Sequence, residues 1–88
     1  MQDDLSMLLL CRAEYALKVS RLTAWLYACP EGASLTYVII LEREGQSACA
    51  RVGDDPVLAR KLFFDMITYG VDVCHLNDVV GDALCELV

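Results

Sequence analysis

The chain has 88 residues, of which 57% are hydrophobic and 23% charged, and its formal net charge is −6. A chain of this length predicts a single domain, spanning residues 1–88. Its apolar fraction exceeds the roughly 45–50% of an average soluble domain. One small protomer does not readily bury this much apolar surface. We therefore expect self-association, most simply as a homodimer.

Only 7 Lys and Arg stand against 13 Asp and Glu, which argues against nucleic-acid binding because contact with phosphates requires clustered cations. The acidic surface favours solubility and would also fit a basic groove on a protein partner.

The cysteines and the first residues predict the cellular compartment. The five cysteines are odd in number and form no Cys-x-x-Cys pair, unlike a secreted disulfide framework. The chain begins with the acidic segment Met1-Gln2-Asp3-Asp4, whereas a signal peptide begins with basic residues. Unbroken apolar runs, such as Met7 to Cys11, are far shorter than the ~20 residues that span a bilayer. We therefore expect a cytoplasmic protein with reduced thiols and no membrane association.

The segment from Cys11 to Val19 alternates between apolar and charged residues. Arg12, Glu14 and Lys18 point to one side, and the apolar residues between them point to the other. This period of two predicts a strand with one buried face. A helix beginning at Asp4 is the alternative, since the leucines and alanines also keep helical spacing. The strand is favoured because the helix would place Arg12 within its apolar face.

Three further segments predict strands. Leu22 to Cys29 is rich in β-forming residues and ends at the turn Pro30-Glu31-Gly32. Leu35 to Glu42 is apolar on both faces, which predicts a central strand covered on both sides. Ser47 to Val52 alternates weakly and predicts an outer strand. The short connections between these segments, one of them Arg43-Glu44-Gly45-Gln46, predict an antiparallel meander.

The last third of the chain predicts two helices. Asp55 is a suitable N-cap, Pro56 suits the first helical position, and Gly70 suits a left-handed C-terminal cap. Asp72 is expected to cap the second helix. The apolar stripes are Leu58, Ala59, Leu62, Phe63, Met66, Ile67 and Tyr69 in the first helix, and Val73, Leu76, Val80, Ala83, Leu84 and Leu87 in the second. The predicted fold class is therefore α+β, an antiparallel meander of three to four strands followed by two helices packed on one face.

Two short blocks carry a resemblance to a known family. Thr36-Tyr37-Val38-Ile39 resembles a Thr-Tyr-Gly-Ile strand, and the block from His75 to Leu84 resembles a His-Leu-x-Asp-Val-(Val/Ile)-Glu-Asp-x-Leu helix. These strand and helix patterns are those of a small uncharacterised family of cytosolic proteins of clostridia-like Firmicutes, described as a domain of unknown function. The resemblance covers the chain from about Arg21 onward. The chain departs from the pattern at Val38 and Gly81. The resemblance implies a bacterial protein with this fold, and it implies no activity.

The second helix also carries a set of residues able to bind a cation. His75, Asp78, Asp82 and Glu86 share one arc, at positions i, i+3, i+7 and i+11. An imidazole and carboxylates on one face are suited to a divalent cation or to a basic partner. Zinc, however, favours three or four ligands converging around a tetrahedron. A solvated acidic face is therefore the simpler interpretation, and a metal-dependent or enzymatic module using His75 is the alternative.

A band of small residues flanks the acidic arc. It comprises Cys74, Asn77, Asp78, Gly81 and Cys85. A mid-helix glycine costs about 1 kcal/mol relative to alanine, so a reason for Gly81 is expected, and close approach of a partner helix is one. We hypothesise a homodimer that uses either this band or the exposed edge of the sheet. Phe64, at the edge of the first helix's stripe, is a candidate anchor for a partner.

No catalytic, cofactor or metal motif is present in the sequence. Cys74 precedes His75 directly, and adjacent helical residues do not face each other, so this pair is unsuited to nucleophilic catalysis. Free cysteines commonly pack as small hydrophobes. The sequence therefore predicts a small, acidic, non-catalytic protein-interaction or regulatory module that self-associates.

Overall fold

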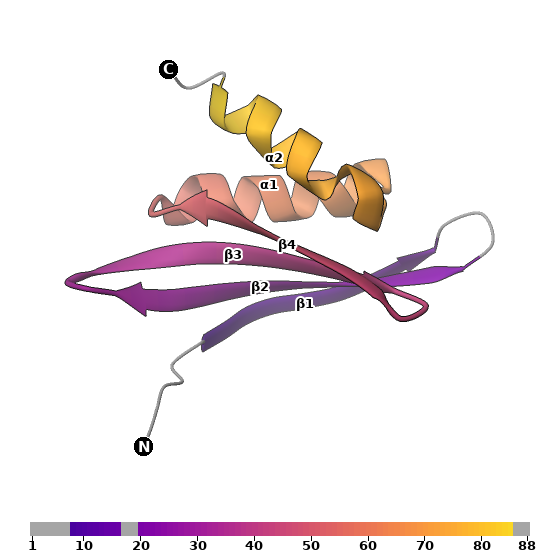
Figure 1. Ribbon diagram of the computed structural model, residues 1–88, viewed down its shortest axis with the longest axis horizontal. Coiled ribbons are helices and arrows are strands. Elements are labelled where there is room, and N and C mark those ends of the chain that lie inside the picture. Colours follow the sequence, from indigo (N-terminus) through magenta and orange to yellow (C-terminus); the bar gives the residue numbers. More distant parts are fainter. Residues whose placement is uncertain (1–7, 17–19, 86–88) are drawn as a thin grey trace.

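The computed structural model describes residues 8–16 and 20–85, the last three of these by their backbone alone (Figure 1). They form an antiparallel sheet of four strands in the order β1-β2-β3-β4, followed by two α-helices on one side of it. The elements are β1 (Leu8–Ala16), β2 (Arg21–Glu31), β3 (Ser34–Arg43), β4 (Gln46–Gly53), α1 (Pro56–Tyr69), the 3-10 turn η1 (Val73–His75) and α2 (Leu76–Cys85). The predicted α+β fold is confirmed.

The first described segment is a strand. Residues of β1 pair with β2 from Leu8 opposite Ala28 to Ala16 opposite Arg21, with one extra residue, Leu10, forming a bulge. The strand prediction is therefore confirmed over residues 11–16, and β1 begins earlier than predicted, at Leu8. The helical alternative is wrong over residues 8–16. Leu17, Lys18 and Val19 lie outside the described residues.

The turns between strands are tighter than the sequence predicted. The strand β2 continues through Pro30 and Glu31, so that the first turn consists of Gly32 and Ala33. Pro30 pairs with Leu35 of β3 beside the turn, and the described residues of β1 reach only as far as Ala28 of β2. Its missing amide hydrogen therefore removes no bond between described residues of β1 and β2. The second turn places Glu44 and Gly45 at φ 50° and 83°, the positive values that a two-residue hairpin of type I′ requires.

The first helix has the caps that its sequence predicted. The Asp55 carboxylate accepts hydrogen bonds from the amides of Val57 and Leu58 at 3.0 and 3.3 Å. Gly70 adopts φ 65°, the left-handed conformation that ends a helix. Asp72 also acts as a cap, but the turn that it caps is η1, and α2 itself begins at Leu76. The predicted second helix therefore starts later than expected.

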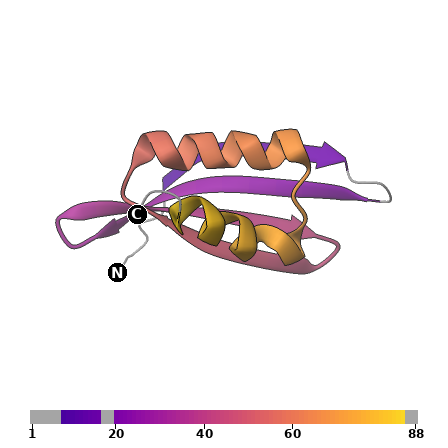
Figure 2. The same cartoon turned by 90° about the horizontal axis from the view of Figure 1, so that it is seen from above.

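The hydrophobic core lies between the sheet and the helices. Seen from above, α1 and α2 lie side by side over the sheet, with α2 along β4 (Figure 2). The buried core residues are Tyr15, Leu22, Ala24, Leu26, Ala28, Tyr37, Ile39, Leu41, Ala50, Val52, Ala59, Leu62, Phe63, Met66, Leu76 and Val80. The strands β2, β3 and β4 contribute alternate residues to the core, and β1 contributes Tyr15, with the partly buried Cys11 and Ala13 packed against it. This alternation identifies the helix-covered side of the sheet.

Candidate functional site

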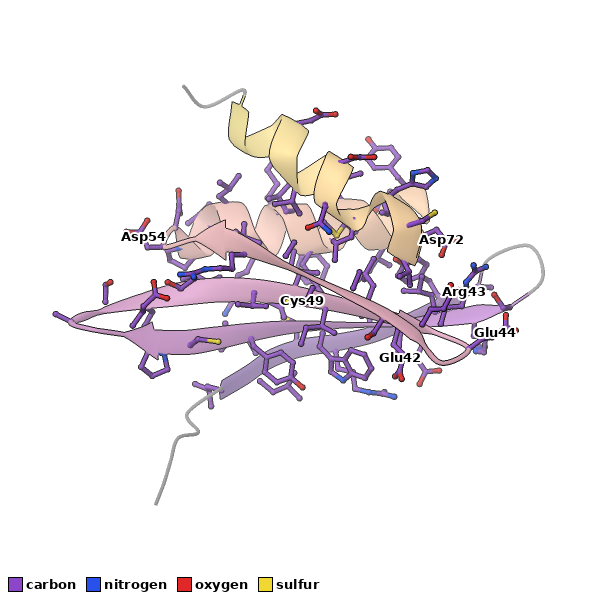
Figure 3. All side chains as sticks on the ribbon, in the orientation of Figure 1. Glu42, Arg43, Glu44, Cys49, Asp54 and Asp72 are labelled. Carbon is purple, nitrogen blue, oxygen red and sulfur yellow. The ribbon has the colours of Figure 1, made fainter. Side chains whose placement is uncertain are left out.

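The opposite side of the sheet is covered by neither helix (Figures 1 and 3). Paired residues of an antiparallel sheet point to the same side. Trp25 pairs with Ile40, which pairs with Cys49, and Tyr27 pairs with Leu9 and with Val38. These six residues are the centre of what we call the open face. The prediction that β3 is covered on both sides is therefore wrong within the described residues, because both helices pack against the same side.

The centre of the open face is apolar and partly exposed. Trp25, Tyr27 and Ile40 are of intermediate exposure, and Leu9 and Cys49 are exposed. Val38 is 9% exposed although it lies outside the core cluster, because its neighbours on the same face shield it. Large aromatic and branched side chains therefore cover the middle of a sheet surface that faces outward.

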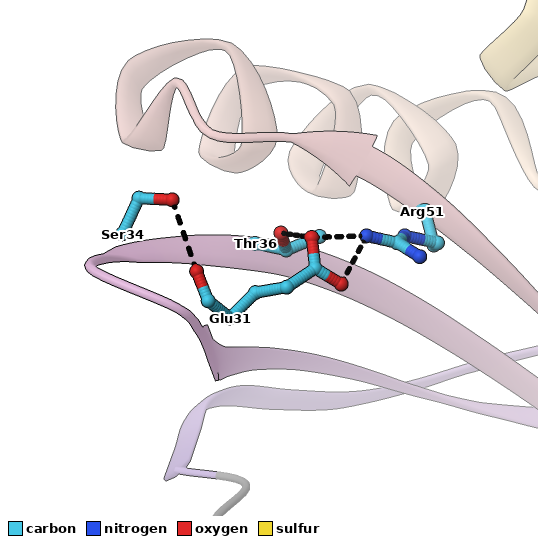
Figure 4. Close-up of polar contacts among 4 residues, drawn as sticks. All are labelled: Glu31, Ser34, Thr36 and Arg51. Atoms are coloured by element: carbon cyan, nitrogen blue, oxygen red, sulfur yellow. Dashed lines mark hydrogen bonds and ion pairs between the residues drawn. The ribbon is translucent and has the colours of Figure 1, made fainter.

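A hydrogen-bonded group of polar residues lies at one end of the open face (Figure 4). The Thr36 hydroxyl donates to Glu31 Oε1 at 2.9 Å, and Arg51 Nη2 donates to both carboxylate oxygens of Glu31. These bonds, that from Thr36 foremost, hold the pKa of the Glu31 carboxyl below its ordinary value. The pair of opposite charges is thereby fixed beside the apolar centre.

Toward its other end the open face carries a second set of paired charges, which begins beside the centre because Arg12 pairs with Trp25. Arg12 donates to Glu14 at 2.8 Å, and Arg21 lies 3.7 Å from the same carboxylate. Glu42 belongs to this end, because it pairs with Thr23 in the sheet and points away from the helices (Figure 3). The described residues of the open face therefore carry three arginines and three glutamates, which cancel, although the chain as a whole carries −6.

Polar contacts on the helix-covered side fix the link between the two helices. The Tyr15 hydroxyl donates to the carbonyl oxygen of Val71 at 2.5 Å. Burial, followed by the nearby Asp72 carboxylate, raises the pKa of Tyr15 to about 12. Arg43 Nε lies 3.3 Å from Asp72 Oδ1, an ion pair in which each side chain is 25% exposed. These residues join β1 and β3 to the segment before α2, and their role is structural.

The predicted acidic arc lies on η1 and α2, and its residues are exposed where the structure describes their side chains. His75 belongs to η1, before α2, and its side chain is exposed, as are those of Asp78 and Asp82. Glu86 lies outside the described residues. Within residues 8–16 and 20–85, no group of three or more His, Cys, Asp or Glu side chains is placed to hold a metal ion.

The predicted small-residue band starts one element earlier than expected. Cys74 lies in η1 and is exposed, whereas Gly81 lies in α2. A Cβ added at Gly81 would meet no heavy atom within 4 Å. Packing among the described residues therefore gives no reason for a glycine at this position. Cys85 ends α2, and its side chain lies outside the described part of the chain.

No family model, curated protein or solved structure matches this chain. The resemblance to the domain-of-unknown-function family therefore rests on its two sequence blocks and stays a prediction. Among the described residues, no helix combines the length and hydrophobicity that crossing a bilayer requires.

The exposed and partly exposed aromatic residues lie both on the helices and on the open face. Phe64 is 54% exposed, as its place at the edge of the stripe indicated, and its ring meets that of Phe63 edge to face at 5.6 Å. Trp25 and Tyr27 lie on the open face. The signal that identifies them is the alternation within β2, where they occupy the face opposite the fully buried Leu22 and Leu26.

Proposed function

We propose that this protein is a small, acidic, non-catalytic protein-interaction module of the cytoplasm, and that it works by self-association. The observation that carries this proposal is the open face, on which Trp25, Tyr27 and Ile40 remain partly exposed at the middle of a sheet. Exposed clusters of this kind mark interaction surfaces in soluble proteins.

The composition of the open face supports binding to a protein. Aromatic residues are enriched in protein interfaces, where they supply large contact areas at a small cost in side-chain entropy. The apolar centre is flanked at its two ends by the Glu31 and Glu14 ion pairs, which resembles the polar rim of an interface. Among the residues that the structure describes, no comparable arrangement of general acid, base and nucleophile supports catalysis, and the single histidine of the chain is exposed.

Sedimentation of the purified chain tests the proposal. We expect the mass of a dimer at tens of micromolar and a shift toward the monomer on dilution. A monomer at every concentration up to this range contradicts self-association. Added salt is expected to leave the association largely intact, because its main contribution is burial of apolar surface and the charges of the open face already balance.

A further inference from the structure

Three surfaces of the protomer compete as the site of self-association: the open face, the edges of the sheet, and the outer side of α2. Resting on the proposed function, we infer that the partner is a second copy of this chain, stacked open face to open face about a two-fold axis. The product is a four-layer assembly, with two sheets in the middle and the helices of each copy outside.

Charge favours the open face over the outer side of α2 as the dimer interface. Asp78 and Asp82 are exposed there, and two copies meeting at Gly81 would bring four carboxylates together. The described residues of the open face carry no net charge, and the charged group at each of its two ends is also neutral. Two copies of an otherwise acidic chain therefore meet there without repulsion, whichever way one sheet is rotated on the other.

Backbone geometry favours the open face over the edges of the sheet as the dimer interface. Each edge strand carries an extra residue, Leu10 in β1 and Val52 in β4, and the pairing with the neighbouring strand shifts at both places. Bulges twist an edge strand and interrupt its row of free amides and carbonyls, which is how natural sheets avoid pairing edge to edge. Continuation of the sheet into a second copy is therefore disfavoured.

The size of the open face fits a dimer. Four strands of 8 to 11 residues give a surface about 20 Å wide and about 30 Å long. Its footprint is on the order of 600 Å², and relief of the side chains adds to it, against roughly 800 Å² per partner in a standard interface. Stacked sheets lie about 10 Å apart, the distance that interdigitating side chains such as Trp25 and Ile40 fill.

Trp25 allows the stacking to be measured without any substitution. It is the single tryptophan of the chain and lies at the centre of the open face. Dilution through the dissociation range is expected to shift its emission to longer wavelength, with the same midpoint as the change in mass measured by sedimentation. Acrylamide quenching of this emission should increase over the same range.

Two lysine variants test the surface directly. Ile40→Lys places an ammonium group at the centre of the stack and should weaken dimerisation about 100-fold or more, because a buried charge without a partner costs several kcal/mol. Gly81→Lys adds the same group on the outer side of α2, where nothing lies within 4 Å, and should leave the dimer unchanged. Circular dichroism verifies that both variants fold. If Ile40→Lys does not fold, Cys49→Lys replaces it, since Cys49 is exposed on the same face.

The outcomes distinguish this inference from the proposed function. A dimer whose Trp25 emission does not change on dissociation, or one that Gly81→Lys disrupts and Ile40→Lys does not, overturns the stacking but leaves self-association standing. A monomer at all concentrations overturns both. Loss of the dimer in Ile40→Lys alone, together with the emission shift, supports the stacked arrangement.

Discussion

The two faces of the sheet are built from alternate residues of the same strands, and their surroundings differ completely. On the helix-covered face, Leu22, Leu26, Ile39 and Leu41 are fully buried. On the open face, neighbouring apolar side chains such as that of Ile40 remain partly exposed. Hydrophobic side chains alone therefore do not determine which side of a sheet is covered. The position of the helices determines it. Because both helices lie on the same side of the sheet, one apolar face is covered and the other is not.

The largest expected effect comes from two adjacent isoleucines of β3. Ile39→Ala should lower the free energy of unfolding by about 3 kcal/mol, because it leaves a cavity beneath the helices. Ile40→Ala, made in the same strand on the other face, should cost about 1 kcal/mol in the dilute protomer, where no second layer packs on it. Urea unfolding at low protein concentration measures both values. Equal losses would contradict the assignment of the two faces.

The contrast between the faces also explains what the sequence could predict. The strands, the caps at Asp55 and Gly70 and the α+β order follow from local patterns, and the structure confirms them. The uncovered side of β3 could not be predicted from Leu35 to Glu42, because both sets of alternate side chains in this segment are largely apolar and either would suit a core. Which set the helices cover depends on where they cross the sheet, and a local pattern contains no information about this.

The candidate interaction residues show the same limit. The exposure of Phe64 follows from its place on a helical stripe, which is local information. The open face is assembled from all four strands, with Leu9 in β1 and Cys49 in β4 far apart in sequence. To identify the residues of this face one must know how the four strands pair, because the bulge at Leu10 changes which residues of β1 reach it. The charge balance of the face depends on the same register.

The helix-covered face also depends on a polar contact, which Tyr15→Phe removes. Loss of the hydrogen bond to Val71 should lower the free energy of unfolding by about 1 kcal/mol at neutral pH. The pKa of Tyr15 is raised from 10.0 to about 12 by folding, so its stabilising contribution is present below pH 10 and is lost as the pH rises through about 12. The difference between wild type and Tyr15→Phe, measured by urea unfolding, should therefore shrink over this range.

Tyr69→Phe is the matched control for that experiment. Tyr69 is 79% exposed at the end of α1, and the same change there should alter the free energy of unfolding by less than about 0.5 kcal/mol. An equal loss in the two variants, or a Tyr15 contribution that persists above pH 12, would show that the contact with Val71 does not hold the helices to the sheet.

A smaller effect is expected on the outer side of the helices. Gly81→Ala should raise the free energy of unfolding by about 0.5–1 kcal/mol, because Gly81 lies within α2 and the added methyl group meets nothing. Gly53→Ala also enters open space but at φ 93°, where an L-residue is strained, and it should destabilise the protein instead. Thermal unfolding of the two variants measures the difference. A loss of stability in Gly81→Ala would indicate that a contact at this position requires the glycine.

The smallest expected effect concerns the acidic residues of that same outer side. Addition of zinc, manganese or calcium should leave the melting temperature unchanged, because His75, Asp78 and Asp82 are exposed and belong to no described group of three placed for a metal ion. A ligand that binds only the folded state raises the melting temperature in proportion to its affinity and concentration, so the measurement detects even a weak site. His75→Ala is the control for any rise. A rise that this substitution abolishes would support the metal-dependent alternative, and it would move the functional surface from the open face to the outer side of α2.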